Sequence, residues 1–354
     1  MSRFLHPQYA GLEAYTPGEQ PRDRQYIKLN TNESPYPPSP AVLAALTEQD
    51  LADLRLYSDP EGTALRAKLA ELYGVEAGQV FLSNGSDDIL NFAFMAFGAD
   101  GAVFPALTYS FYPVFAGLHG VAYETVPLQT DFTIDAAGMQ GRGKLTVFPN
   151  PNAPTGIALP LDQVEAIVAS NPEHVVVVDE AYVDFGADSA VPLLQKYDNL
   201  LVVMTYSKSR SMAGARLGFA LGSRGLIEDL EKLKYSTNPY NVNRLTLKLG
   251  AAAVDSDGYF REKAREIMAT RERTAQALRA MGFALPDSQA NFLFVTHPKV
   301  AGETLYRKCK EKGVLIRHFS DPAIASYNRV TIGTPAEMEA FLAVVQTILE
   351  EEGA

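Results

Sequence analysis

The chain has 354 residues, 47% of them hydrophobic, and a formal net charge of −11 at pH 7. This length suits two domains, and the apolar fraction is large enough for buried cores. The acidic balance argues against a nucleic-acid partner. No apolar run approaches the length of a membrane span, and the first residues lack the layout of a signal peptide, so no membrane partner is expected.

Cys309 is the only cysteine of the sequence, which excludes an internal disulfide framework. A chain without disulfides is typical of a reducing compartment, so we expect a cytoplasmic location. The five histidines are scattered without the spacing of metal ligands, and no metal site is expected.

The first 35 residues are rich in proline and glycine and are predicted to form an irregular arm that packs against another surface, the small domain or a partner subunit. Two helices follow this arm. The pair Ser39-Pro40 is typical of a helix start, because serine caps the helix and proline suits its first turn. A second helix is predicted from Gly62-Thr63 to Tyr73, with Gly74 as its end.

Short apolar runs then alternate with helical patterns as far as residue 221. The four valines 175–178 are apolar on both faces, as in a strand of a parallel sheet that helices cover on both sides. This alternation predicts an open α/β sheet. Strands are expected over 80–82, 102–104, 121–126, 145–148, 175–178, 200–204 and 217–221, and helices over 86–97, 109–118, 161–169 and 191–197.

The pattern changes beyond Gly225. Helices are predicted over 226–235 and 245–254, followed by a long amphipathic helix that carries Phe260 and Leu278 on one face. The remainder predicts a small α+β unit, with strands 291–295, 314–317 and 330–332 and helices 300–312 and 336–350. We therefore expect three parts: an N-terminal arm (1–35), a large domain (36–255) and a small C-terminal domain (256–354).

Polar residues cluster where three predicted strands end, which is where open α/β sheets bind ligands. Asn84-Gly85-Ser86-Asp87 opens a helix whose N–H groups and dipole suit a phosphate, although it also fits an ordinary helix cap. Asp179 ends the valine strand, and a carboxylate buried there requires a partner. Lys208 follows the third strand.

Lys208 lies in a stretch rich in serine and small residues, which by itself could be a surface loop. Its neighbours favour a site. A nucleophilic amine, an acid for a ring nitrogen, and an arginine with a helix N-terminus for a phosphate are the groups that a pyridoxal phosphate enzyme needs. Lys208, Asp179 and Arg216 supply the three side chains.

Several motifs resemble those of a known family. The stretch Thr205-Tyr206-Ser207-Lys208-Ser209, with Arg216 after it, resembles the lysine motif of fold-type I aminotransferases, and Asp179-Glu180-Ala181-Tyr182 resembles their aspartate motif. Residues 149–156 are similar to their Asn-Pro-Thr-Gly loop. Over nearly its whole length the chain most resembles the histidinol-phosphate aminotransferase family, with further counterparts at residues 29–36, 239–243, 314–317 and 329–334.

The resemblance implies a fold-type I PLP-transferase: a mostly parallel central sheet flanked by helices, a smaller α+β domain, and pyridoxal 5'-phosphate (PLP) as cofactor. Lys208 would bind the cofactor covalently and move the substrate proton, Asp179 would pair with the ring nitrogen, and Tyr182 would contact the ring oxygen. Tyr109, otherwise a core tyrosine, matches the aromatic residue that stacks on the ring. The phosphate would be held around Gly85, Ser86, Asp87, Ser207 and Arg216.

Two further positions bear on the cofactor. Tyr57 matches a tyrosine that reaches the phosphate from the partner subunit, so the resemblance implies a homodimer with shared sites; without it, Tyr57 would be a packing residue. The family commonly has asparagine directly before Pro-Thr-Gly, but Ala153 occupies that position here. Asn152, one residue earlier, could replace it only if the loop shifts.

The substrate side chains are also implied by the resemblance. Arg329 resembles the arginine that binds the α-carboxylate, a pairing that lysine would not reproduce. Arg317 and Tyr15 resemble groups that bind a distal phosphate, and Asn30 or Asn32 on the arm could close over it. Without the family, both arginines could equally be surface cations at strand ends.

The resulting hypothesis is a PLP-dependent aminotransferase of histidine biosynthesis that acts on L-histidinol phosphate and 2-oxoglutarate, a 2-oxo acid, by a ping-pong mechanism. The alternatives are an aromatic-amino-acid aminotransferase and a threonine-phosphate decarboxylase, which would use the same cofactor residues. A hypothesis of another class is a non-catalytic domain that binds PLP or an effector.

Overall fold

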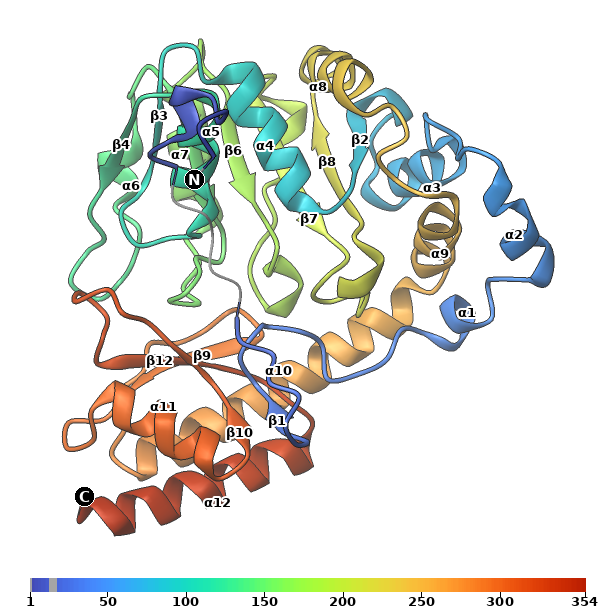
Figure 1. Cartoon of the computed structure of the whole chain (residues 1–354). Helices are drawn as coiled ribbons and strands as arrows, with labels where there is room; N and C mark the ends of the chain where they lie inside the picture. The colour runs from blue at the N-terminus through green and yellow to red at the C-terminus, as the bar shows by residue number, and fades with distance from the viewer. Residues whose placement is uncertain (1, 13–17) are drawn as a thin grey trace.

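The computed structural model describes residues 2–12 and 18–354 of the chain. A large α/β part surrounds one central sheet, and a smaller part with its own sheets lies beneath it in the view of Figure 1. The long helix α10 (Asp257–Ala280) runs obliquely from the large part into the small one. The predicted limits of the arm and the two domains, at residues 35 and 255, stay a prediction.

The described residues form a central sheet of seven strands in the order β2-β8-β7-β6-β5-β3-β4. Strand β8 is antiparallel to both of its neighbours, and the remaining pairs are parallel. The expected mostly parallel α/β sheet is therefore confirmed. Its strands are β2 (Val80–Ser83), β3 (Ala102–Pro105), β4 (Tyr123–Val126), β5 (Leu145–Pro149), β6 (Val176–Asp179), β7 (Leu200–Thr205) and β8 (Gly218–Gly222).

Helices cover both faces of this sheet, as the run of valines predicted. Val177 packs into a core on one face, whereas Val176 and Val178 pack into a core on the other. Such burial on both sides is typical of parallel strands. The first face is covered by α4 (Ser86–Phe97), α5 (Phe111–His119) and α8 (Arg224–Thr237), and the second by α3 (Thr63–Tyr73), α7 (Leu161–Ala169) and α9 (Arg244–Asp255).

The small part combines an antiparallel sheet with two helices. Its described strands have the order β11-β12-β9, and β1 pairs in parallel with β10, which joins the arm to the small part. The elements are β1 (Ile27–Lys28), β9 (Phe292–Thr296), β10 (Val314–Leu315), β11 (Arg317–His318), β12 (Tyr327–Thr331), α11 (Gly302–Glu311) and α12 (Pro335–Glu352).

Two predictions of secondary structure were wrong in detail. The strand expected over 314–317 is two strands in different sheets, because the chain changes partner at the buried Ile316. The helix expected over 191–197 is a short 3-10 helix, Val191–Gln195, with proline in its first turn. The short helices α1 (Pro40–Leu43), α2 (Glu48–Ala52) and α6 (Ala136–Met139) complete the α-helices of the described residues; α2 and α6 were not predicted.

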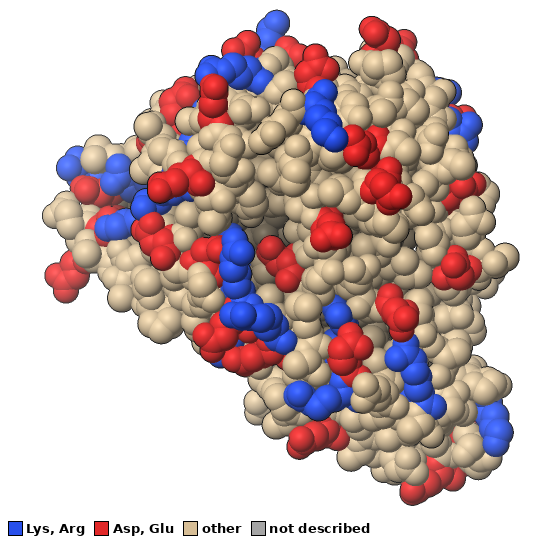
Figure 2. Space-filling view, turned by 180° about the vertical axis from the view of Figure 1, so that it is seen from behind, with Lys and Arg blue, Asp and Glu red and all other residues tan. Residues whose placement is uncertain are grey.

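Within the described ranges, no helix combines the length and apolar character needed to cross a bilayer. Seen from behind, the surface carries acidic and basic side chains close together, and a hollow opens near the middle of this face (Figure 2).

Candidate active site

A cavity of about 180 Å³ lies at the carboxyl ends of the parallel strands. Strand β6 contributes Asp179, the loop after β7 contributes Lys208, and the start of α4 contributes Ser86 and Asp87. These residues come from separate strand ends, which converge because parallel strands end at one edge of a sheet. Predicted site residues that line the same cavity are Tyr109, Tyr182, Ser207 and Arg216.

Lys208 is half-buried and points its ammonium group into this cavity. The Nζ atom donates to the carbonyl oxygen of Thr31 at 3.4 Å and lies 5.8 Å from the centre of the Tyr182 ring. Within the described part of the chain the ammonium group forms no ion pair with a carboxylate. The amine is therefore positioned for a ligand between Asp179 and Arg216.

Asp179 is 4% exposed and has two hydrogen-bond donors. The hydroxyl of Tyr112 donates to its Oδ2 at 3.0 Å, and the N–H of Ala181 donates to its Oδ1 at 3.3 Å. Burial raises the pKa of this carboxyl to about 6, although both hydrogen bonds oppose the shift. A cationic ring nitrogen would favour the ionised form.

The start of α4 and Arg216 form the second end of the cavity. Gly85 has a φ of +89°, and a Cβ atom there would lie 2.6 Å from Nη2 of Arg216. Gly218 is equally constrained, because its Cβ atom would lie 2.5 Å from the nitrogen of Ser86. The two glycines let the helix N-terminus, the arginine and strand β8 approach one another, which is the arrangement of an anion site.

Asp87 links this end to the aromatic wall. Its Oδ1 accepts a hydrogen bond from the hydroxyl of Tyr109 at 2.7 Å, and its Oδ2 accepts one from Nη2 of Arg216 at 3.1 Å. Tyr109 and Arg216 are thus both held by one side chain in the first turn of α4. Asp87 therefore positions the groups around the anion site.

A hydrogen bond joins Asn32 on the arm to Tyr182 on the cavity wall. The Nδ2 atom of Asn32 donates to the hydroxyl of Tyr182 at 2.9 Å, and Thr331 binds the main chain and side chain of Asn32. Asn32 is buried, so it ties the arm to β12 and to the cavity wall. The structure places Asn32 on Tyr182, whereas the sequence suggested that it could close over the substrate.

The side chain of Asn152 points away from the cavity. Its Nδ2 donates to the carbonyl of Leu107 at 3.0 Å, and its Oδ1 accepts from Thr108 at 3.2 Å. Ala153 lines the cavity instead. A contact between Asn152 and a cofactor ring would require both hydrogen bonds to break, so its predicted role stays a prediction that depends on a loop shift.

A second cavity, of about 390 Å³, adjoins the first and shares Tyr109 and Ala153 with it. Arg317 and Arg329 both line it, with aromatic side chains that include Phe319. The two arginines predicted for substrate binding are thus together, in a cavity that adjoins the one containing Lys208. Two cations in one cavity suit an anionic substrate.

Two other predicted residues, Asn30 and Tyr57, line neither cavity. Asn30 is buried; its side chain donates to Glu19, and its carbonyl accepts from Arg329 at 3.3 Å. Tyr15 lies outside the described residues. Tyr57 is 78% exposed and stacks on Tyr240 with ring centres 4.4 Å apart, away from either cavity of its own chain.

Sequence reasoning missed Tyr112, Thr31 and Glu33. Tyr112 occupies an apolar helix face, where nothing distinguishes a tyrosine that binds a carboxylate from one that only packs. Thr31 and Glu33 line the cavity because the arm crosses it. Both residues lie within 29–36, a stretch that resembles the family, and this position is the signal that could have identified them.

The residues present fit PLP. The cavity offers an amine, a buried acid with a raised pKa and an anion site opened by two glycines. These match the carbonyl, the ring nitrogen and the phosphate of that cofactor. Among residues 2–12 and 18–354 no group of histidine, cysteine and acidic side chains is arranged to hold a metal ion.

Known proteins resemble the chain over almost all of its length. A histidinol-phosphate aminotransferase from Brachyspira hyodysenteriae is 48% identical over 99% of this chain and 100% of its own, and one from Marinomonas sp. is 49% identical over 98% and 100%. Among solved structures, histidinol-phosphate aminotransferase from Sinorhizobium meliloti in complex with pyridoxal-5'-phosphate superposes with a TM-score of 0.87, at 24% identity over 99% of this chain and 98% of that one.

The L-threonine-O-3-phosphate decarboxylase of Porphyromonas gingivalis superposes with a TM-score of 0.80, at 20% identity, over 92% of this chain and 99% of that one. The fold is therefore shared by enzymes of different reaction type, and family membership comes from the sequence. Residues 24–345 match the model of the family Aminotransferase class I and II. The chain belongs to the class I and II aminotransferase family.

Proposed function

We propose that the chain is a PLP-dependent aminotransferase that transfers the amino group of L-histidinol phosphate to 2-oxoglutarate by a ping-pong mechanism, as a step of histidine biosynthesis. The observation that carries this proposal is the convergence of Lys208, Asp179 and Arg216 on one cavity, with two arginines in the cavity beside it. Full-length relatives with nearly half of their residues identical support the choice of substrate.

Several residues of the first cavity have a proposed task. Asp179 binds the ring nitrogen, Arg216 and the N–H groups at Ser86 bind the phosphate, and Tyr109 covers the ring. When bound, PLP accepts the electron pair left on the substrate carbon after its proton is removed. Lys208 would take that proton from the α-carbon and deliver it to C4′ of the cofactor, which is general acid–base catalysis.

The second cavity is the proposed substrate site. Arg317 and Arg329 supply two cations, which suit the phosphate of the donor and the two carboxylates of the acceptor. The aromatic side chains that line this cavity suit the flat ring of the donor. One site can thus accept both substrates in turn, as a ping-pong mechanism requires.

We further propose a homodimer in which Tyr57 reaches the cofactor phosphate of the partner subunit. Tyr57 and its neighbour Leu56 are exposed, as are Leu51, Leu54 and Tyr240. Exposed apolar side chains grouped in this way are typical of a protein interface. A cytoplasmic location is proposed because the one cysteine, Cys309, is buried and has no disulfide.

A half-reaction screen tests the proposal. The PLP-loaded protein is mixed with L-histidinol phosphate, phenylalanine, tyrosine or threonine phosphate in separate samples, and the absorption band of the cofactor is followed. We expect stoichiometric conversion to the pyridoxamine form, fastest with histidinol phosphate. Faster conversion with an aromatic amino acid would overturn the substrate assignment, and release of carbon dioxide from threonine phosphate would indicate a decarboxylase.

Lys208→Ala separates an enzyme from a binding domain. A lysine that carries the proton cannot be replaced by a methyl group, so turnover should be lost while PLP still binds through its phosphate. Full turnover in the variant would contradict the proposed role of Lys208. A wild-type protein that binds PLP without turning over any donor would indicate a non-catalytic effector-binding domain.

A further inference from the structure

Lys208 lies on an irregular segment between β7 and β8, and this segment needs an anchor. Residues 206–217 contain a short 3-10 turn and no strand, and Ser211 has a φ of +57° although it is not glycine. A catalytic amine on such a segment is placed accurately only if neighbouring side chains hold the backbone.

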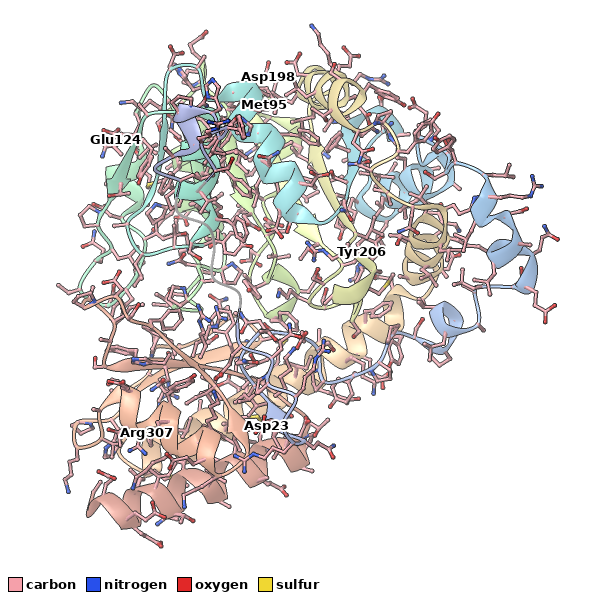
Figure 3. The ribbon with its side chains drawn as sticks, viewed as in Figure 1. Asp23, Met95, Glu124, Asp198, Tyr206 and Arg307 are labelled. Carbon is pink, nitrogen blue, oxygen red and sulfur yellow. The ribbon has the colours of Figure 1, made fainter. Side chains whose placement is uncertain are left out.

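Arg210, two residues after Lys208, is buried and charged, with 5% of its surface exposed. Its Nη2 atom pairs with Oδ1 of Asp257 at 2.8 Å, at the first residue of α10. The guanidinium group also lies between two rings, 5.4 Å from the centre of Tyr206 and 5.7 Å from that of Phe260. Tyr206, labelled in Figure 3, lies between the sheet and α9.

The side of the segment that carries Arg210 faces a cavity instead of a filled core. This cavity, of about 470 Å³, is lined by residues that include Ser209, Arg210, Asp257, Phe260, Asp184 and Met268. Ser209 is bonded to Asp184, which comes two residues after Tyr182. Since the cavity leaves room for the segment to move, the polar contacts and not close packing hold it on this side.

We propose, on the basis of the proposed function, that Arg210 is a positioning residue: its ion pair with Asp257 fixes the Lys208 segment to the start of α10. The helix α10 leads into the small part, which carries Arg329 and Arg317 on its sheet. The pair therefore links the placement of the amine to the element that carries the substrate site. It acts through Lys208 and touches neither cofactor nor substrate.

The test separates covalent attachment of PLP from binding of pyridoxamine 5'-phosphate, which needs the same cavity but forms no bond to Lys208. Full-length Arg210→Gln protein should attach PLP more slowly by about tenfold to 100-fold, because a displacement of about 1 Å has an effect of that order. Its dissociation constant for pyridoxamine 5'-phosphate should stay within about twofold of wild type, since a shift of that size is under 0.5 kcal/mol.

Three further variants test the assignment to the ion pair. Arg210→Lys keeps the charge and should restore part of the attachment rate. Arg261→Gln removes the other arginine that pairs with Asp257, an exposed one outside the Lys208 segment, and should attach PLP at the wild-type rate. The double variant Arg210→Gln/Asp257→Asn should attach PLP about as slowly as the slower of the two single variants, and well short of the product of their two slowdowns, because both changes remove the same interaction.

Arg210→Gln with the wild-type attachment rate would overturn the proposal. So would a parallel loss of PLP attachment, pyridoxamine 5'-phosphate affinity and melting temperature, which would indicate a purely structural role. A wild-type chain that binds neither compound would instead refute the proposed function, so the two failures are distinguishable.

Discussion

Arg317 and Arg329 occupy directly opposite positions in the antiparallel pair β11 and β12. Like charges at opposite positions destabilise a sheet. Here both guanidinium groups lie 5.9 Å from the centre of the Phe319 ring, and both line the cavity next to Lys208. An anion that binds between the two arginines would relieve their repulsion, which would explain why two like charges occupy opposite positions in this sheet.

Replacing either arginine should weaken the use of both substrates. Arg329→Lys keeps the charge but loses the planar fork, and we expect kcat/KM to fall roughly 30-fold or more for donor and acceptor, because a charge-assisted hydrogen bond contributes about 2 kcal/mol. Arg317→Gln should have a similar effect. Steady-state kinetics with each substrate varied measures both values.

The control for these variants is Arg307→Lys, which changes an exposed arginine paired with Glu311 on α11. Its kinetic constants should equal those of wild type. If Arg329→Lys retained wild-type kcat/KM for both substrates, the cavity would not be the substrate site.

Much of the fold followed from local patterns in the sequence. Helix α4 and helix α7 have the predicted bounds, and the all-valine strand is buried on both faces. Elements of this kind have strong periodicity or clear end signals; helix α3, for example, ends before Gly74, which has a left-handed backbone. The pairing of strands does not follow from local patterns. The sequence of residues 314–317 predicts one strand, and only the tertiary structure divides it between two sheets.

The residues of the candidate site also divide into those that local patterns predict and those that depend on tertiary packing. Strand ends located Asp179 and Lys208, because polar residues that follow an apolar strand stand out in a sequence. Tyr112 was missed, since its hydroxyl meets Asp179 only after α5 packs on the sheet. The sequence also could not predict in which direction a side chain points. The amide of Asn152 donates to the carbonyl of Leu107, whereas its neighbour Ala153 lines the cavity.

Gly85→Ala should weaken the binding of PLP. The new methyl group would lie 2.6 Å from the guanidinium group of Arg216, and the φ of +89° disfavours any side chain there. We expect the dissociation constant of PLP to rise by about tenfold or more, the effect of roughly 1.4 kcal/mol of strain. Fluorescence titration of the protein with PLP measures it.

Gly225→Ala is the matched control, because a Cβ atom at Gly225 meets nothing within 4 Å. This variant should bind PLP like wild type. Equal dissociation constants for the Gly85 and Gly225 variants would mean that the phosphate is bound somewhere other than the start of α4.

Tyr112→Phe should move the pH dependence of PLP binding upward. The pKa of Asp179 is raised to about 6 by burial, and the hydrogen bond from Tyr112 holds it lower than burial alone would. Without that donor the pKa rises further. Only the ionised carboxylate pairs with a cationic ring nitrogen, so affinity for PLP should decline as the pH falls through this pKa, and in the variant this decline should begin at a higher pH.

Dissociation constants for PLP measured between pH 5 and pH 9 test this shift. Tyr197→Phe removes a partly buried hydroxyl that donates to Glu165 and does not line the cavity, and it should leave the profile unchanged. An identical profile for Tyr112→Phe and wild type would show that Asp179 does not control the binding of PLP.

Glu180→Gln should stabilise the protein at alkaline pH. Glu180 is 2% exposed, and burial raises its pKa to about 8, while hydrogen bonds from Ser189 and Ala190 oppose the shift. Because the folded state holds this proton more tightly than the unfolded chain, the free energy of unfolding contributed by Glu180 decreases as the pH rises from about 4.5 to about 8. Each unit of raised pKa corresponds to about 1.4 kcal/mol.

Glutamine has nearly the same shape and does not ionise, so the variant should lack this loss. Its melting temperature should be close to that of wild type at pH 5 and clearly higher at pH 9. Glu165→Gln is the control, because Lys196 lowers the pKa of the partly exposed Glu165, and that variant should show no gain at pH 9. A Glu180→Gln protein that is less stable than wild type by the same amount at pH 5 and pH 9 would contradict this prediction, since a constant difference means that the titration of Glu180 does not contribute to stability.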